Sequence, residues 1–273
     1  MRTAIITSAL FCCFFINFSF GQAQKGWELG GFLGFSSYYG DLNSLFSFRR
    51  IGPSAGFFAR KNFDGRICLR IMGSYANVGG HDASSESLFE KARNLSFSSN
   101  IFEASALVEF NFQDFHGNTR DDKPIAPYLL AGVGLFTFDP MAKYQGNYYR
   151  LQPLGTEGQS LGEEYSLVAG SILLGGGVKF ELNPLWSIEA EIIGRVTTTD
   201  YLDDVSGVYA DYRSVGAYHS NIAGALSDRS VEVGERIGLP GSQRGNSKNN
   251  DSYIFTTVSI VYRFMPLECP AYR

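Results

Sequence analysis

The sequence predicts an all-β protein, an eight-stranded antiparallel transmembrane β-barrel with long outer loops and short periplasmic turns. Three observations lead to this fold class. Eight segments read as strands, and most run about 8–13 residues, close to the ~9–11 residues that cross a bilayer at a tilt. The connections between these segments are alternately long and short. Beyond the N-terminal segment, no run of about 18 apolar residues predicts a membrane-spanning helix.

Residues 1–23 are expected to form a secretory signal peptide, cleaved after residue 21 or 23. Arg2 supplies a weak positive charge, the run AIITSALFCCFFINFSF is apolar, and FGQA offers small residues for cleavage. A membrane anchor is the alternative, but the apolar run is at the low limit for a span. We therefore expect Sec-dependent export to the outer membrane, with a barrel domain at 24–264 and a periplasmic tail at 265–273.

The composition narrows the class of protein. The formal net charge is −4 and no basic stripe is present, so nucleic acid is not an expected partner. Aromatic and glycine residues are abundant, with 23 Phe, 15 Tyr and 31 Gly, which suits a β architecture. Beyond the signal peptide only Cys68 and Cys269 remain, which argues against a disulfide scaffold and leaves a bridge between these two open.

The strands are expected in the order 27–40, 53–60, 67–75, 100–112, 127–138, 171–181, 185–197 and 252–264. Alternation is clearest in 100–112, where Phe102 and Ala104 share one face and Glu103 lies on the other. The charged residues on the second face are Glu28, Arg70, Glu103, Glu109, Lys179, Glu189, Glu191 and Arg195. We expect them to fill the lumen as ion pairs, since eight strands leave room only for side chains; a proton or ion path is the alternative.

The connections favour a membrane barrel over a soluble one. The segments at 76–99, 139–170 and 198–251 are long, whereas KNFDGR at 61–66 and LNP at 182–184 are short. Outer-membrane barrels sort their connections in this way, with long outer loops and short periplasmic turns. A soluble lipocalin-like barrel is the alternative, and it would place the apolar faces inside and the charges outside.

Several unusual strings occur together: YYGDLN, RNLSF, APYLLAGVGLF, LQPLGTEGQ, TTTDYLDDVSGVY, LSDRS and a closing VYRF followed by CP. With them the chain resembles, from about Trp27 to Pro270, the PorG-like family of Bacteroidota outer-membrane β-barrels. The residues of these strings that we take as family-like are Tyr39, Gly40, Asp41, Thr156, Glu157, Gly158, Asp200, Tyr201, Leu202, Asp203 and Asp204.

The resemblance implies a non-enzymatic component of the type IX secretion system, which also serves gliding. Such a component docks or anchors the periplasmic ring of PorK and PorN type, or of GldK and GldN type, to the outer membrane. It implies no catalytic residue, no cofactor and no small-molecule substrate. The periplasmic tail would face the ring, and its expected contact residues are Met265, Pro266, Leu267 and Glu268.

Three carboxylates, Asp200, Asp203 and Asp204, stand where the chain leaves the seventh strand. The favoured interpretation is a loop root in which aspartates bond nearby backbone N–H groups. The arginines expected within reach are Arg195, Arg213 and Arg229. A calcium site with oxygens from 246–251 is a second interpretation, although the EF-hand pattern is absent.

Two functions other than docking stay open. One is a small porin-like channel. The other is a surface hydrolase of the omptin type on the Asp200–Asp211 loop, in which Asp203, Asp204, Asp211 and His219 would supply an Asp–Asp and an Asp–His pair to activate water. His219 is the one histidine in the long connection at 198–251, and spacing does not place it near Asp203.

Overall fold

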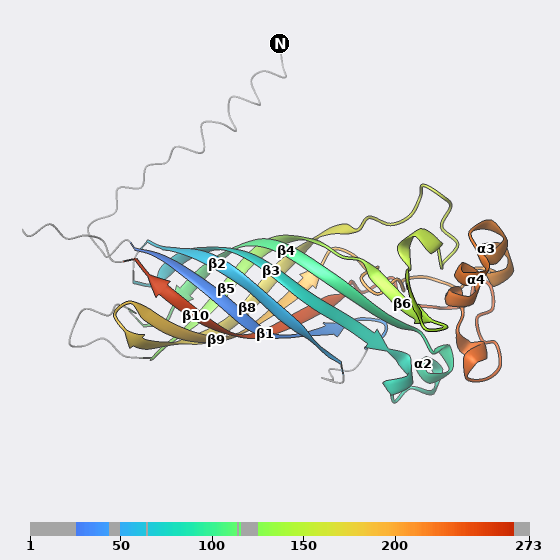
Figure 1. Cartoon of the computed structure of the whole chain (residues 1–273), viewed down its shortest axis with the longest axis horizontal. Helices are drawn as coiled ribbons and strands as arrows, with labels where there is room; N and C mark the ends of the chain where they lie inside the picture. The colour runs from blue at the N-terminus through green and yellow to red at the C-terminus, as the bar shows by residue number, and fades with distance from the viewer. Residues whose placement is uncertain (1–25, 44–49, 64, 114, 116–124, 265–273) are drawn as a thin grey trace, which may run out of the picture.

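The computed structural model describes residues 26–43, 50–63, 65–113, 115 and 125–264, which form a closed barrel of eight antiparallel strands (Figure 1). The barrel strands are β1 (Trp27–Tyr39), β2 (Ile51–Asn62), β3 (Ile67–His81), β4 (Ser96–Asn111), β5 (Ile125–Thr137), β8 (Val168–Asn183), β9 (Trp186–Thr197) and β10 (Ser252–Arg263). They follow the order β3, β2, β1, β10, β9, β8, β5, β4 around the wall, and pairing of β4 with β3 closes it. The predicted fold class is confirmed. The segments 1–23 and 265–273 lie outside the described residues.

The alternation of side chains fixes which face is the lumen. In β4, Phe102 is 61% exposed, whereas Glu103 beside it is 3% exposed. The same alternation runs along the other strands, so the charged faces line the interior and the apolar faces form the outer wall. The lipocalin-like alternative, which needs the apolar face inside, is therefore wrong.

The hairpin of β3 and β4 is longer than the sequence predicts. Strands were expected only over 67–75 and 100–112, but the pairing continues to His81 opposite Ser96. The added residues are mostly Asn, Gly and Ser, whose low strand propensity hid the continuation from the sequence pattern. Because β2 stops pairing with β3 before this point, the added part of the hairpin stands beyond the barrel wall.

Further short elements gather at the same end of the barrel, and the sequence pattern had missed them. β6 (Pro140–Tyr144) pairs with β4, and β7 (Asn147–Arg150) pairs with β6. The helices are α2 (Leu88–Arg93), α3 (Tyr212–Tyr218) and α4 (Asn221–Ser227), with single 3-10 turns η1 (Asp82–Ser84), η2 (Gln152–Leu154) and η3 (Ser230–Glu232). Among the described residues, no helix is both long and apolar enough to cross a membrane.

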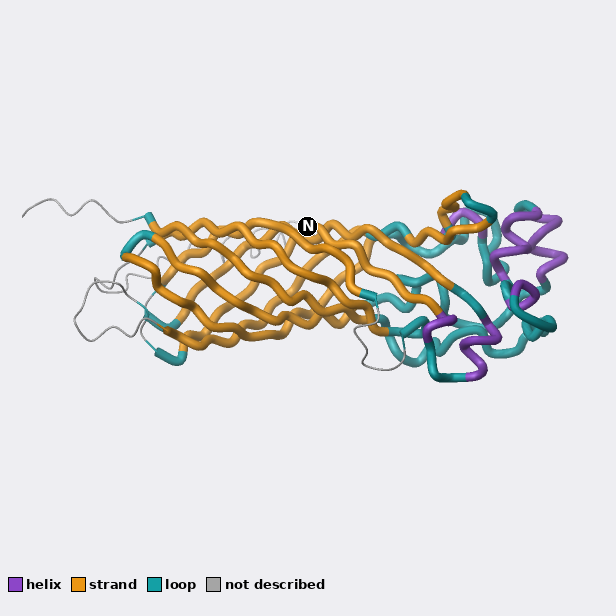
Figure 2. Tube along the Cα trace, turned by 60° about the horizontal axis from the view of Figure 1, so that its bottom comes forward, coloured by secondary structure: helices purple, strands orange, loops and turns teal. Residues whose placement is uncertain are grey.

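The two ends of the barrel differ in size, as predicted. Figure 2 shows the helices and long connections at one end, which we call the loop end, and tight turns at the other, which we call the turn end. The turn between β8 and β9 is only Pro184–Leu185. Of the residues that the structure describes outside the wall, nearly all therefore lie at the loop end.

The buried apolar residues form two clusters. One lies inside the barrel and includes Phe58, Met72 and Leu107. The other joins inward-facing strand residues such as Phe97 to loop residues such as Leu202. The second cluster shows that the long connections fold down onto the mouth of the barrel, rather than extending away from it.

Candidate functional site

The lumen near the turn end is filled by buried ion pairs. The four cations are Arg60, Arg70, Lys179 and Arg263, and the four carboxylates are Glu28, Glu109, Glu189 and Glu191. Arg60 and Arg70 are both 0% exposed. We call these eight residues the lumen network. It carries no net charge, because it contains as many cations as carboxylates. Such compensation is what a buried charge requires.

Arg60 lies at the centre of the lumen network. Its Nη1 is 2.7 Å from Oε2 of Glu28, and its Nη2 is 2.6 Å from Oε2 of Glu189. Its Nε is 3.0 Å from Oε2 of Glu109. These contacts connect β2 to β1, β9 and β4 across the lumen. Arg60 was not predicted as an interior residue, although its place two residues after the inward-facing Phe58 was a usable signal.

Arg70 and Lys179 complete the network. Arg70 pairs with Glu109, and its Nη1 lies 2.8 Å from Oε2 of Glu191. Its guanidinium carbon is 4.1 Å from the centre of the Phe58 ring. Lys179 Nζ lies 3.0 Å from Oε2 of Glu109. The predicted interior position of these charges is confirmed, and at this level side chains from several strands occupy the barrel.

A separate pair lies closer to the loop end. Arg195 Nε is 3.1 Å from Oε1 of Glu103, and the Tyr253 hydroxyl donates to Oε2 of Glu103 at 2.8 Å. The guanidinium carbon of Arg195 lies 3.6 Å from the centre of the Phe255 ring, a cation–π distance. Arg195 is therefore committed to the lumen and does not reach the aspartates of the loop.

Asp203 belongs to a buried cluster at the mouth of the barrel. The Tyr38 hydroxyl oxygen lies 2.5 Å from Oδ2 of Asp203 and 2.8 Å from Oδ1 of Asp251. One hydroxyl proton cannot serve both, so both contacts are hydrogen bonds only when one carboxyl is protonated and donates. Burial is the main cause that raises the pKa of Asp203 well above its usual range, and the charge of Asp251 raises it further. Burial also raises the pKa of Asp251. We call these three residues the latch.

The latch also organises the backbone around it. Oδ1 of Asp203 accepts a hydrogen bond from the N–H of Val205 at 2.9 Å, and Oδ2 of Asp251 accepts one from the N–H of Leu202 at 2.9 Å. The Asp203 bond is the local aspartate-to-backbone bond expected of a loop root, whereas the Asp251 bond connects the two ends of the loop and was not predicted.

Asp204 points into a second buried cluster. Thr156 donates to its Oδ2 at 2.5 Å, and the Tyr165 hydroxyl donates to its Oδ1 at 2.7 Å. Arg244 Nη2 lies 3.7 Å from Oδ2. Burial, partly offset by Arg244, raises the pKa of Asp204 to about 6. The Asp204 backbone has φ of +68°, a left-handed conformation that aspartate tolerates better than most residues.

Glu157 joins the two long connections. Its Oε1 accepts from the N–H of Ser206 at 2.9 Å, and its Oε2 accepts from the N–H of Gly207 at 3.1 Å. Arg244 Nη1 donates to Glu157 Oε1 at 3.0 Å and to the carbonyl of Asp204 at 2.6 Å. Residues 155–165 and 199–251 thus form one body over the mouth of the barrel, which we call the loop plug.

The YYGDLN string contacts the loop plug. A Cβ on Gly40 would lie 1.9 Å from Oδ1 of Asp251, so only glycine fits beside the latch. Oδ2 of Asp41 accepts from the N–H of Asn246 at 2.7 Å. Gly158 adopts φ of +85°, and Tyr39 is the last residue of β1. Family-like strings that are far apart in sequence therefore meet around one buried centre.

Other sequence-predicted residues lie apart from this centre. Asp200 is half-buried, and burial raises its pKa to about 7. Asp211 caps α3, and Nε2 of His219 lies 2.9 Å from the carbonyl of Gln159. The side-chain partners of Asp203 and Asp204 are Tyr, Thr and Arg residues, so the Asp–His pair of the hydrolase interpretation is not assembled among the described contacts.

The arginine partners differ from those expected. Arg213 donates to the Tyr212 hydroxyl and Arg229 pairs with Glu232, while Arg244 takes the place beside Asp204. Arg244 follows Asp204 by forty positions, a separation from which spacing alone gives no contact. Within the part of the chain that the structure describes, no three His, Cys, Asp or Glu residues gather as metal ligands.

Two further predictions fall partly outside the described residues. Cys68 is a buried free thiol at the turn end of β3, while Cys269 is not among the described residues. The tail residues proposed to contact a partner, Met265, Pro266, Leu267 and Glu268, also lie outside them.

Solved structures with a similar arrangement are eight-stranded outer-membrane barrels. Neisserial surface protein A is 11% identical, with a TM-score of 0.45, over 89% of this chain and 100% of that one. Ail of Yersinia pestis is 12% identical, with a TM-score of 0.41, over 88% and 99%. The outer membrane enzyme PagL is 13% identical, with a TM-score of 0.34, over 86% and 98%. At these identities and scores the likenesses carry no information about function.

Sequence comparison assigns the chain to a family. No curated protein matches the chain significantly. A family model described as "Domain of unknown function (DUF6089)" matches residues 6–223, which include seven of the eight barrel strands. The chain therefore belongs to the DUF6089 family.

Proposed function

We propose that this protein is a non-enzymatic component of a type IX secretion system that docks or anchors the periplasmic ring to the outer membrane. The observation that carries the proposal is the combination of an apolar outer wall with a lumen and mouth that are both filled. A barrel of this kind offers its two ends, rather than a passage or a pocket, as working surfaces. The assignment to this system rests on the PorG-like sequence strings.

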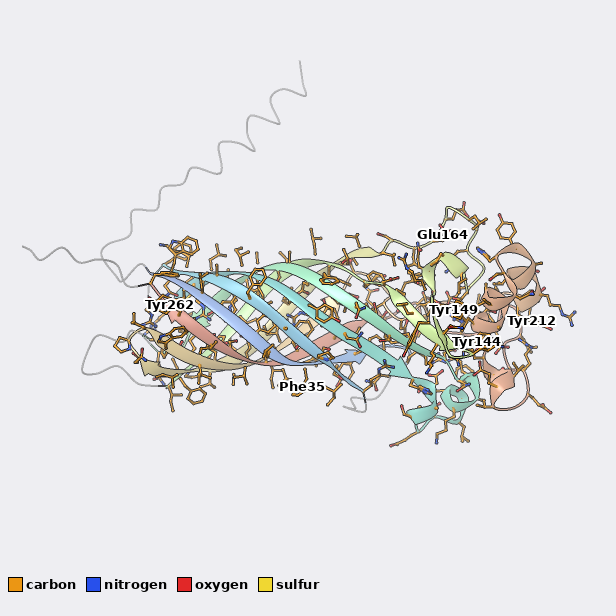
Figure 3. The ribbon with its side chains drawn as sticks, in the orientation of Figure 1. Phe35, Tyr144, Tyr149, Glu164, Tyr212 and Tyr262 are labelled. Atoms are coloured by element: carbon orange, nitrogen blue, oxygen red, sulfur yellow. The ribbon has the colours of Figure 1, made fainter. Side chains whose placement is uncertain are left out.

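The outer wall supports integration into a bilayer. Leu33, Phe57 and Leu135 are 72%, 73% and 67% exposed, far more apolar surface than a soluble barrel leaves uncovered. Figure 3 shows the side chain of Phe35 pointing away from the wall. Lipid would stabilise such a surface, which no other described part of the chain covers.

An aromatic girdle supports the same placement. At the turn end the rings of Trp186 and Tyr262 lie 5.0 Å apart, and those of Tyr262 and Phe264 lie 5.1 Å apart. Trp27 is 53% exposed near them, in the neighbouring strand β1. Girdles of Trp, Tyr and Phe mark the membrane–water boundary in outer-membrane barrels. Because short turns face the periplasm in such barrels, the turn end would face the proposed ring.

The filled lumen weighs against the channel alternative. Passage would require the buried Arg60 and Arg70 pairs to separate and the loop plug to lift. Breaking a single buried pair costs about 3–5 kcal/mol. The docking proposal needs neither movement, and it leaves the barrel as a rigid anchor.

The test is recovery of ring proteins with the tagged full chain from outer membranes in mild detergent, with the co-purifying proteins identified by mass. We expect a PorK-type lipoprotein and a PorN-type protein in a stable ratio. Replacing Met265, Pro266, Leu267 and Glu268 together with alanine should lower that recovery. The matched control is Asp211→Asn, a change of a partly exposed residue at the loop end, which should leave recovery unchanged.

Every variant is checked for the heat-modifiable gel shift of a folded barrel. Recovery of the folded barrel alone, across several detergents and after mild crosslinking, contradicts the docking role. Equal recovery with the tail variant and the control contradicts the tail as a contact, and directs attention to the turns.

A further inference from the structure

An open apolar groove runs over the outer face of the barrel wall where β2, β3, β4 and β5 lie side by side. Its volume is about 620 Å³. Small residues form its floor, among them Ala55, Gly73 and Ala104, and Phe57 and Phe102 form its sides. The depression exists because small outward-facing residues on adjacent strands are surrounded by rings that project from the wall. Its shape and lining suit a hydrocarbon chain.

The groove lies in the loop-side half of the wall. It extends to Thr137 and Val168, which are the loop-side ends of β5 and β8. Above it the outward face of the β3–β4 hairpin turns polar. The Tyr75 hydroxyl donates to Oδ1 of Asn100 at 3.0 Å, and Nδ2 of Asn77 donates to the same oxygen at 2.8 Å. This change from apolar to hydrogen-bonding side chains is typical of a membrane–water boundary.

A basic pocket of about 430 Å³ follows on the same face, farther along the hairpin. It gathers three cations from separate segments: Arg50 before β2, Lys143 on β6 and Arg229 after α4. Tyr75 lines the groove and His81 lines the pocket. They are six residues apart on β3, which is about 20 Å along the strand at ~3.3 Å per residue.

Two of the three cations are available for an anion. Arg50 is exposed, and its Nη1 donates to the carbonyl of Phe97 at 3.1 Å, which holds the guanidinium over the strand face. Lys143 is exposed on β6. In the described part of the chain neither has a carboxylate partner, whereas Arg229 is paired with Glu232 and donates to Ser96.

We propose that this face binds a phosphorylated glycolipid of the outer leaflet, with an acyl chain in the groove and a phosphate between Arg50 and Lys143. The order of surfaces along the hairpin, apolar, hydrogen-bonding and then cationic, matches the order of acyl chain, sugar and phosphate in such a lipid. Arginine and lysine are the side chains that recognise phosphate, arginine with two parallel hydrogen bonds. The inference rests on the membrane placement in the proposed function, and not on a secretion role.

The experiment measures lipid binding to the purified full chain in detergent micelles, by native mass spectrometry with titrated lipid. The probes are bis-phosphorylated lipid A, the same lipid after removal of its phosphates, and inorganic phosphate as a competitor. We expect the phosphorylated lipid to bind at least tenfold more tightly than the dephosphorylated one. Millimolar inorganic phosphate should not displace it, because the acyl chain holds the lipid in the groove.

Two variants test the two halves of the site. Arg50→Gln with Lys143→Gln should weaken binding of the phosphorylated lipid about tenfold or more. Ala104→Leu, which fills the groove, should weaken both lipids by a similar factor. The matched controls are Lys61→Gln with Arg213→Gln, which removes two cations elsewhere, and Ala190→Leu, the same change on the outward face of β9; neither should alter binding.

Three results overturn the proposal. The first is equal binding of phosphorylated and dephosphorylated lipid. The second is displacement by inorganic phosphate alone, which would indicate a site for free anions. The third is the same loss of affinity in the controls. If a variant lacks the heat-modifiable shift, Lys143→Gln alone and Ala55→Leu replace it. Recovery of ring proteins is measured separately, so failure here and failure of the docking role are distinguishable.

Discussion

The hydroxyl oxygen of Tyr38, at the end of β1, lies 2.5 Å from a carboxyl oxygen of Asp203 and 2.8 Å from one of Asp251, so it bridges two buried carboxyls. This contact connects the wall of the barrel to both ends of the longest loop, which leaves β9 shortly before Asp203 and enters β10 just after Asp251. This part of the attachment of the loop plug to the barrel therefore depends on one phenol and on a proton carried by one of the two acids.

Replacing Tyr38 with phenylalanine should loosen the loop plug while leaving the barrel closed. Two buried carboxyls lose their shared partner, which costs roughly 1–3 kcal/mol of local stability for an unsatisfied buried group. Hydrogen exchange over 199–211 should quicken, with the heat-modifiable gel shift intact. Tyr75→Phe is the control, because that hydroxyl lies on the exposed outer face. Unchanged exchange in the Tyr38 variant would show that the latch does not hold the plug.

The loop plug should be more stable in mild acid than at neutral pH. Burial raises the pKa of Asp204 to about 6 from 3.8, so the folded state retains a proton that the unfolded loop releases. The stabilisation is complete below about pH 4 and is lost as the pH rises to about 6, above which the Asp204 contribution is flat. Asp203 and Asp251 shift in the same direction. Exchange over the plug, corrected for intrinsic rates, should therefore be slower at pH 4.5 than at pH 7.5, and Asp204→Asn should reduce the difference. A plug that grows more stable toward neutral pH would contradict this sign.

Removing Arg60 should destabilise the whole barrel. Arg60→Met leaves Glu28, Glu109 and Glu189 with one cation fewer in a buried lumen, at a cost of about 3–5 kcal/mol. The urea midpoint for unfolding in micelles should fall. Lys61→Met, one residue along and outside the lumen, should leave it nearly unchanged. Adding Glu189→Met to Arg60→Met should recover part of the loss, because it removes one of the uncompensated charges.

The barrel should be electrically silent in planar bilayers. Side chains of the lumen network and the loop plug lie across the path of any ion, and the network has no net charge that would attract ions of one sign. Single-channel recordings of the purified chain should show no steady conductance at moderate voltage. Reproducible steps that scale with protein concentration, and that change in Glu109→Gln, would favour the channel function instead.

The sequence predicts the wall of this protein better than its loops, for a physical reason. Glu103 and Phe102 are neighbours in the chain and lie on opposite faces of a strand, so a period of two residues is enough to assign the lumen and the outer wall. Arg60 was missed because its strand carries two successive phenylalanines, Phe57 and Phe58, and two glycines, which blur that period. An alternating pattern therefore predicts the structure of strands, in which each side chain faces either the lumen or the outside.

The contacts of the loop plug have no such period. Arg195, Arg213 and Arg229 were expected within reach of the three aspartates of the loop root, but the arginine beside Asp204 is Arg244. The choice depends on how two long connections fold over the barrel mouth, and spacing along the chain does not encode it. The bond from Asp203 to the N–H of Val205 was predictable, because the two residues are only two positions apart, whereas the bond from Asp251 to the N–H of Leu202 spans 49 positions and was not.

The latch has a consequence for the order in which the protein assembles. β1 and β10 are the first and last barrel strands, and Tyr38 stands opposite Tyr253 where they pair. Asp251 reaches Tyr38 only once that seam has formed, so the plug can lock only on a chain whose two terminal strands have already met. A barrel left open at the seam would keep its longest loop free, and a protease that cuts within 199–251 would distinguish the unfinished molecule from the finished one.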